Sequence, residues 1–154
     1  LAAAAEPLTE SPAAAPEPPT LSATAPSLNG VRVLVVDDDL VAVDLTREIL
    51  MRAGAQVWGC AGGGEALAML QQCQPDVLVS DIEMPNQDGY FLIRRVRELE
   101  PDHGGRTPAV ALSAYSRPED RIRSLKAGFN LHVSKPVEPS ELITVVASLA
   151  GRTG

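Results

Sequence analysis

The chain has 154 residues, of which 45% are hydrophobic and 21% charged, and its net charge is -7. This length suits one well-filled domain with a tail, and an acidic balance without any block of Lys or Arg argues against a nucleic-acid partner. No apolar run approaches the roughly 20 residues of a membrane-spanning helix, and the Ala-rich start lacks the basic flank of a signal peptide. Cys60 and Cys73 form neither a metal pair nor a disulfide framework, which favours a reducing compartment. We therefore expect a cytoplasmic segment without membrane contact, in a parent protein that could itself be membrane-anchored.

Pro and Ala dominate the first 28 residues, which contain nine Ala, six Pro and three Glu but no Lys, Arg or aromatic residue. Such a segment cannot bury a core, and recurrent Pro favours extended conformations. We predict a disordered interdomain linker over residues 1–29, a folded domain over 30–150 and a short tail over 151–154. Because the chain begins with Leu1 and not with Met, we expect a further domain before the linker.

From Gly30 onward, short apolar runs alternate with segments whose apolar residues recur at helical spacing. This alternation is typical of parallel strands joined by crossover helices, and it predicts five strand–helix units in one α/β domain. The predicted strands lie near residues 31–36, 56–60, 77–79, 109–112 and 131–134. The helix after the fourth strand is expected to start at Pro118, to turn Ile122 and Leu125 inward and to end at Gly128.

Polar side chains stand where four of these strands end. Carboxylates follow the first and third strands, a hydroxyl follows the fourth, and a lysine follows the fifth. In an open parallel sheet the ligand crevice lies outside the carboxyl ends of the strands, at the point where the strand order reverses. We therefore expect these five residues to share one site: Asp37, Asp38, Asp81, Ser113 and Lys135.

The residue types at these positions suit phosphate chemistry. Carboxylates about 4 Å apart repel by about 4 kcal/mol per pair at an effective dielectric of about 20, so the acidic cluster needs a cation. Oxygen ligands without His or Cys favour Mg²⁺, which typically takes one or two carboxylates and leaves one Asp free as a nucleophile. Lys135 adds a positive charge, and Ser113 adds a donor for a phosphoryl group. The sequence therefore predicts phosphoryl transfer to an aspartate.

Four motifs resemble those of receiver domains of two-component response regulators: LVVDDD at 34–39, SDIEMPNQDG at 80–89, ALSAY at 111–115 and HVSKP at 132–136. The resemblance covers the whole folded part, and the intervals between the motifs also suit that family. It implies a flavodoxin-like fold, a single doubly wound (βα)5 domain whose five-stranded parallel sheet has the strand order 2-1-3-4-5. It also implies a domain that accepts a phosphoryl group from a phosphohistidine and supplies the catalysis for its own phosphorylation and dephosphorylation.

The resemblance also assigns roles near the acidic cluster. Asp81 resembles the phosphoacceptor, and Asp37 and Asp38 resemble the acidic pair that organises Mg²⁺ together with Asp81. The backbone carbonyl of Glu83 resembles a further ligand of this ion. The side chain of Glu83 adds a carboxylate that we expect to repel phosphate or to steer a hydrolytic water, so Glu83→Gln is predicted to alter the lifetime of the phosphoryl group.

The remaining roles concern the phosphoryl oxygens and the conformational switch. Ser113 and Lys135 resemble the hydroxyl and the lysine of the family, and Ser113 is also a switch residue by this resemblance. The bond before Pro136 is expected to be cis. His132 stands where the family usually has Tyr or Phe, so a switch that responds to titration is a hypothesis for this position. Gln87 stands where many relatives carry Met.

The segments that flank the folded part indicate the kind of parent protein. A Pro/Ala tether before it, no output domain after Leu149 and the segment HVSKPVEPSEL at 132–142 favour the C-terminal receiver of a hybrid sensor histidine kinase. The expected partners are the phosphohistidine domain of the kinase, in the same polypeptide or in a neighbouring subunit, and a histidine phosphotransfer protein. An orphan receiver and a fusion to an unrelated upstream domain are equally compatible with the sequence.

One enzyme family offers an alternative. Asp37, Asp39 and Val41 also fit the DxDxV pattern of haloacid dehalogenase-type phosphohydrolases. That family needs a further acidic pair after its lysine, which the two glutamates at the start of the last helix do not supply, and it leaves Asp81 without a role. The sequence therefore favours the receiver, in which Asp39 is expected to cap the first helix.

Overall fold

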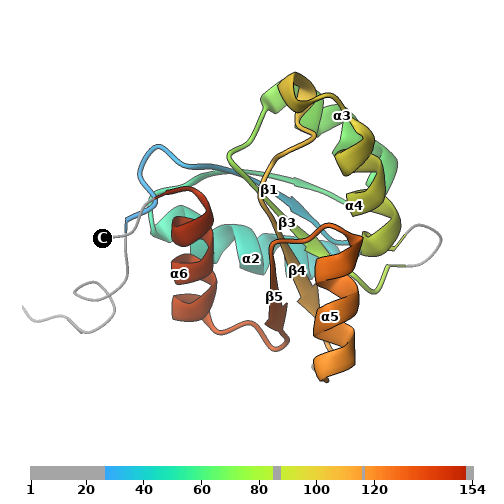
Figure 1. Ribbon diagram of the computed structural model, residues 1–154. Coiled ribbons are helices and arrows are strands. Elements are labelled where there is room, and N and C mark those ends of the chain that lie inside the picture. The colour runs from blue at the N-terminus through green and yellow to red at the C-terminus, as the bar shows by residue number, and fades with distance from the viewer. Residues whose placement is uncertain (1–26, 85–87, 116, 152–154) are drawn as a thin grey trace, which may run out of the picture.

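Figure 1 shows the computed structural model, which describes residues 27–84, 88–115 and 117–151. One sheet contains five parallel strands: β1 (Arg32–Val36), β2 (Gln56–Cys60), β3 (Val77–Asp81), β4 (Ala109–Ser113) and β5 (Leu131–Ser134). Their order across the sheet is β2-β1-β3-β4-β5. The α/β class and the strand order 2-1-3-4-5 are therefore confirmed.

Helices cover both faces of the sheet (Figure 1). One face carries α2 (Leu40–Arg52) and α6 (Pro139–Leu149), and the other carries α3 (Gly63–Cys73), α4 (Gly89–Glu98) and α5 (Pro118–Ala127). A short 3-10 helix, η1 (Pro101–His103), precedes β4. Because both faces are covered, β3 and β4 are buried along their whole length and read as near-continuous apolar runs. Among the described residues, no helix combines the length and the apolar character that crossing a membrane requires.

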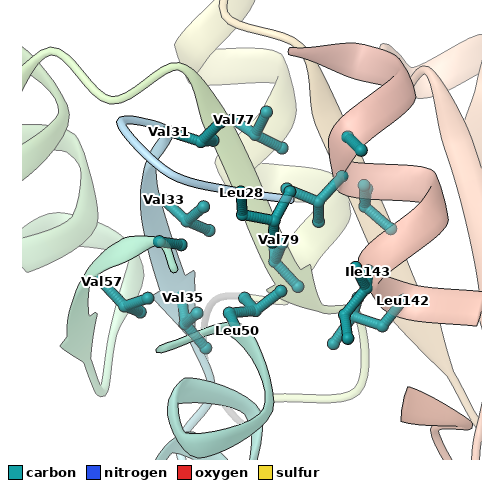
Figure 2. Packing of buried hydrophobic residues seen from close by; sticks show 14 of the residues in the cluster. Leu28, Val31, Val33, Val35, Leu50, Val57, Val77, Val79, Leu142 and Ile143 are labelled. Atoms are coloured by element: carbon teal, nitrogen blue, oxygen red, sulfur yellow. The ribbon is translucent and has the colours of Figure 1, made fainter. Parts of the chain in front are cut away.

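The hydrophobic cluster under α2 and α6 fixes where the packed part of the chain begins (Figure 2). Leu28 is 0% exposed and belongs to this cluster, together with Val79 of β3 and Leu142 of α6. Its backbone N–H donates to the carbonyl of Ala53 at 2.8 Å. The packed part therefore begins before Gly30, where the boundary was expected. The rest of the predicted linker, residues 1–26, and the tail residues 152–154 lie outside the described residues.

Helix termini follow local rules that the sequence carries. Asp39 is the N-cap of α2, where its side chain accepts a hydrogen bond from the N–H of Val41 at 3.0 Å, as expected. Pro118 occupies the first position of α5, and Gly128 caps its end with a φ of 130°. Both boundaries of α5 are therefore as predicted.

The predicted inward face of α5 is wrong. Ile122 is 51% exposed and Leu125 is 45% exposed, whereas Ser124 is fully buried. The small Ser124 faces inward, and Phe129, which follows the C-cap Gly128, is buried in the core cluster on this face of the sheet. The Ser124 hydroxyl donates to the carbonyl of Arg121 at 2.8 Å, so its burial leaves no donor unpaired. Apolar spacing alone therefore selected the wrong side of the helix.

Candidate functional site

Three carboxylates meet at the carboxyl ends of β1 and β3, where the strand order reverses. Asp37 and Asp38 directly follow β1, and Asp81 is the last residue of β3. Each offers one oxygen, and these oxygens all lie within 4.8 Å of one another. Asp37 and Asp81 are buried, while Asp38 is exposed. The oxygen-only donor set fits a hard divalent cation such as Mg²⁺.

Lys135 brings a positive charge to the same cluster. It directly follows β5, and its Nζ lies 2.8 Å from Oδ1 of Asp81 and 3.9 Å from Oδ2 of Asp37. Its backbone N–H donates to the carbonyl of Ser113 at 2.8 Å, which fixes the start of the loop after β5 against the end of β4. The bond between Lys135 and Pro136 is cis.

Burial disfavours the charged forms of the carboxyl groups in this cluster. The pKa of Asp37 is raised from 3.8 to about 6, chiefly because burial disfavours its charged form, although the backbone N–H of Asp39 opposes this shift. Burial also raises the pKa of Asp81, although the hydrogen bond from Lys135 opposes the shift. For Lys135, burial would lower the pKa, but the hydrogen bond and the charges of Asp81 and Asp37 outweigh it and raise the pKa. The cluster therefore has one lysine against several carboxylates and favours a further cation.

Ser113 is held by a network that starts in the loop after β3. Its hydroxyl lies 2.5 Å from Oε2 of Glu83 and accepts a hydrogen bond from the N–H of Tyr115 at 2.9 Å. The N–H of Ala114 donates to Oε1 of Glu83 at 3.1 Å. Glu83 thus binds two donors at the end of β4 through its side chain. The resemblance assigned a role to its backbone carbonyl, and the geometry adds this separate role for its carboxylate.

His132 is buried in β5, opposite Ala111 of β4. Neither ring nitrogen makes a hydrogen bond of good geometry with a described protein group, although the backbone of Tyr115 lies near enough to the ring to oppose the lowering of its pKa. Burial lowers the pKa of His132, and the nearby charge of Arg121 lowers it further. The lowered pKa of His132 favours the neutral ring, and its part in a switch stays a prediction.

The structure brings together most of the residues that the sequence singled out. Asp37, Asp38, Asp81 and Lys135 share one cluster, and Ser113 is joined to it through the backbone of Lys135. Sequence reasoning missed the N–H of Ala114, because a backbone donor carries no side-chain signature. The only available signal was its place directly after the serine at a strand end. Gln87 lies outside the described residues.

The comparison with known families decides between the receiver and the phosphohydrolase. The sequence model of the response regulator receiver domain matches residues 33–147. This chain belongs to that family. It is a receiver domain of phosphorelay signalling, and no comparison supports the haloacid dehalogenase alternative.

Relatives of this receiver domain differ greatly in length. An uncharacterised 14.6 kDa protein of Leptolyngbya boryana is 49% identical over 114 residues, which are 74% of this chain and 86% of that protein. The hybrid signal transduction histidine kinase D of Dictyostelium discoideum is 34% identical over 128 residues, which are 79% of this chain but 8% of the kinase. The receiver domain therefore spans most of one relative and a small part of another.

A solved receiver domain shows the same fold with its metal. The receiver domain of a sensor histidine kinase from Pseudomonas aeruginosa, with a magnesium ion coordinated in its active site cleft, is 30% identical and has a TM-score of 0.72. The match covers 79% of this chain and 98% of that one. That neighbour holds its ion in its active site cleft, and this chain has an acidic cluster of Asp37, Asp38 and Asp81 at the carboxyl ends of its strands.

Proposed function

We propose that this receiver domain accepts a phosphoryl group from a phosphohistidine onto Asp81 in a Mg²⁺-dependent reaction. The observation that carries the proposal is the position of the Asp81 carboxylate, which lies 2.8 Å from Nζ of Lys135 and within 4.8 Å of oxygens of Asp37 and Asp38. A nucleophilic carboxylate between a lysine and a cation-binding pair suits phosphoryl transfer, which needs positioning and charge neutralisation more than covalent chemistry.

In the proposed step, a carboxylate oxygen of Asp81 attacks the phosphorus of the donor. The new P–O bond forms as the P–N bond to the histidine breaks, and the departing imidazole nitrogen keeps the electron pair and takes up a proton. The ammonium of Lys135 neutralises charge on the phosphoryl oxygens, and Ser113 offers a hydroxyl at the end of the neighbouring strand. The product is an aspartyl phosphate.

The acidic residues would hold the metal. Asp37, Asp38 and Asp81, with the backbone carbonyl of Glu83, are the proposed Mg²⁺ ligands. When bound, Mg²⁺ supplies positive charge that offsets the repulsion between the carboxylates and the incoming phosphoryl group. The burial of Asp37 supports this assignment: desolvation raises its pKa, and a bound cation would favour the charged form of its carboxylate.

The wider context is part of the same proposal. The domain, which begins at Leu28 and not at Gly30, receives its phosphoryl group from the phosphohistidine domain of a histidine kinase in the cytoplasm, or exchanges it with a histidine phosphotransfer protein. The similarity to a hybrid kinase supports placing it in such a parent chain, with the residues before Leu28 as the proposed linker and 151–154 as a proposed tail. Its switch would pass through Ser113 and His132.

Intact mass after incubation with Mg²⁺ and acetyl phosphate tests the proposal. Wild type is compared with Asp81→Asn and with Asp102→Asn, a matched change at an exposed carboxylate of η1. We expect one phosphoryl adduct on wild type and on Asp102→Asn, none on Asp81→Asn, and none in EDTA. An adduct of equal yield on Asp81→Asn, or one that persists in EDTA, would contradict the proposal.

A further inference from the structure

The Glu83 carboxylate occupies two donors at the end of β4, directly after Leu112, which pairs with Asp81 of β3. Oε2 lies 2.5 Å from the Ser113 hydroxyl, and Oε1 accepts from the N–H of Ala114 at 3.1 Å. This is a bidentate contact between one anion and two neighbouring donors. A carboxylate and a phosphoryl group are both anionic acceptors, so one can take the place of the other.

The Ser113 hydroxyl and the Ala114 N–H have no further proton to donate. A serine hydroxyl carries one proton, and Ser113 already accepts from the N–H of Tyr115 at 2.9 Å, so its proton points to Glu83. The N–H of Ala114 likewise has a single proton, which Glu83 takes. Ser113 is also 2% exposed, so solvent offers it little replacement. Any new acceptor at these two groups must first displace the carboxylate.

The charge of Glu83 is felt at the acceptor. Burial is the largest cause of the raised pKa of Asp81, and the negative charge of Glu83 raises this pKa further. A phosphoryl group would add roughly -1.5 to -2 charges on the same side. The two anions would then repel one another across a partly buried site, where repulsion is weakly screened.

We infer that the Glu83 side chain is a built-in competitor of the phosphoryl group, seated on Ser113 and Ala114 until phosphorylation of Asp81 expels it. This inference rests on the proposed function of Asp81. When the phosphoryl group displaces Glu83, the contact of Glu83 with Ser113 and Ala114 is lost. This loss offsets part of the binding energy of the phosphoryl group, so the site holds the group less tightly and releases or passes it on more readily. Glu83 is therefore a positioning residue that sets how strongly the site retains its product.

The surroundings leave space for the displaced side chain. Glu83 lines an open cleft of about 360 Å³ together with Met84, Tyr90, Tyr115 and Arg123. The wall of this cleft carries both signs of charge, because the guanidinium of Arg123, 4.2 Å from the centre of the Tyr90 ring, lines it together with the carboxylates of Asp88 and Asp120. An expelled carboxylate can thus remain in a polar, solvent-accessible place.

Binding of beryllium trifluoride at saturating Mg²⁺ tests the inference without any hydrolysis. This anion is tetrahedral when bonded to a carboxylate and so stands in for the phosphoryl group. Wild type, Glu83→Gln and Glu83→Ala are compared with Glu100→Gln, a matched loss of charge at an exposed residue before η1. The amide signal of Ala114 follows binding in NMR and also reports the resting contact with Glu83.

We expect both Glu83 variants to bind the anion about tenfold more tightly or more, the equivalent of one lost charge-assisted hydrogen bond, with Glu100→Gln equal to wild type. The Ala114 amide should also shift in the Glu83 variants before any anion is added. Equal affinities in all four proteins, or weaker binding by the Glu83 variants, would overturn the inference while leaving Asp81 as acceptor. Binding by none of them would contradict the proposed function and the inference together.

Discussion

Asp37 keeps a charge where burial opposes it, and this shapes the stability of the metal-free protein. Asp37 is 4% exposed, and its pKa is about 6 in the folded state against an ordinary 3.8. Between these values the folded protein binds a proton that the unfolded chain does not, so the contribution of Asp37 to stability falls as the pH rises from about 4 to about 6. Above that range Asp37 is a net cost to folding that a bound cation would offset.

Asp37→Asn should therefore stabilise the protein without Mg²⁺. The amide can still accept from the N–H of Asp39, which Oδ1 of Asp37 binds at 2.9 Å, but it carries no charge. We expect the free energy of unfolding in urea at about pH 7.5 with EDTA to rise by about 1 to 3 kcal/mol, and the gain to shrink towards pH 4. Added Mg²⁺ should stabilise wild type more than the variant. A variant that is less stable than wild type in EDTA at about pH 7.5 would refute this account.

His132 is a second residue that costs stability at its position. Because burial lowers its pKa, the unfolded chain binds the proton more readily, and the stability linked to His132 is lost as the pH falls below about 6.5. His132→Phe removes two unpaired ring nitrogens and should raise the free energy of unfolding by about 1 kcal/mol at pH 7 and by more at about pH 5.5. Urea titrations at both pH values measure it. A gain that does not grow at the lower pH would argue against a buried, neutral histidine.

At the scale of the elements, one arginine ties α4 to the loops on its side of the sheet. Nε of Arg97 donates to the carbonyl of Gly128, Nη1 donates to the carbonyls of Gly105 and Thr107, and Nη2 donates to Oδ1 of Asn130, at distances from 2.7 to 3.1 Å. These partners precede β4 and β5, the strands that end in Ser113 and Ser134. The guanidinium of Arg97 thus holds the segments that lead into β4 and β5, at the ends of these strands opposite to the acidic cluster.

Arg97→Lys should weaken this support, since an ammonium cannot reach four acceptors in one planar arrangement. We expect the free energy of unfolding to fall by about 2 kcal/mol or more, because buried carbonyls lose their donors. Arg95→Lys on the same helix is the control: its side chain is exposed and pairs with Glu98, so the change should stay within about 0.5 kcal/mol. A similar decrease in the free energy of unfolding in both variants would show that the four hydrogen bonds of Arg97 do not contribute specifically to stability.

The elements also show what sequence can and cannot predict. The strands and their polar ends were predictable because apolar runs that stop at Asp81 or Lys135 carry a strong local signal. The buried face of α5 was not predictable. Ile122 and Leu125 have the spacing of a buried stripe, but Ser124 is the residue that the structure buries. The contacts of Arg97 and of the Glu83 carboxylate join segments far apart in the chain, and no local pattern encodes them.

At the scale of the whole molecule, the strand order makes the site. Placing β1 between β2 and β3 brings the carboxylates of Asp37 and Asp38 next to Asp81, although more than forty residues separate them along the chain. The outer position of β5 then delivers Lys135 across β4 to the same edge. Helices on both faces of the sheet bury β3 and β4 along their whole length, and the carboxylates and Lys135 lie at or just beyond the carboxyl ends of the strands (Figure 1). The strand order thus brings Asp37, Asp38, Asp81 and Lys135 together at one edge of the sheet, where Asp81 is the proposed acceptor.

Identification of the phosphorylated residue tests the assignment of Asp81 as the acceptor. Protein incubated with Mg²⁺ and acetyl phosphate is treated with borohydride, which reduces an aspartyl phosphate to homoserine, and the peptides are sequenced by mass spectrometry. We expect homoserine at position 81 alone, and none when EDTA is present. Homoserine at position 37 or 38, or at none of the aspartates of a folded protein, would contradict it.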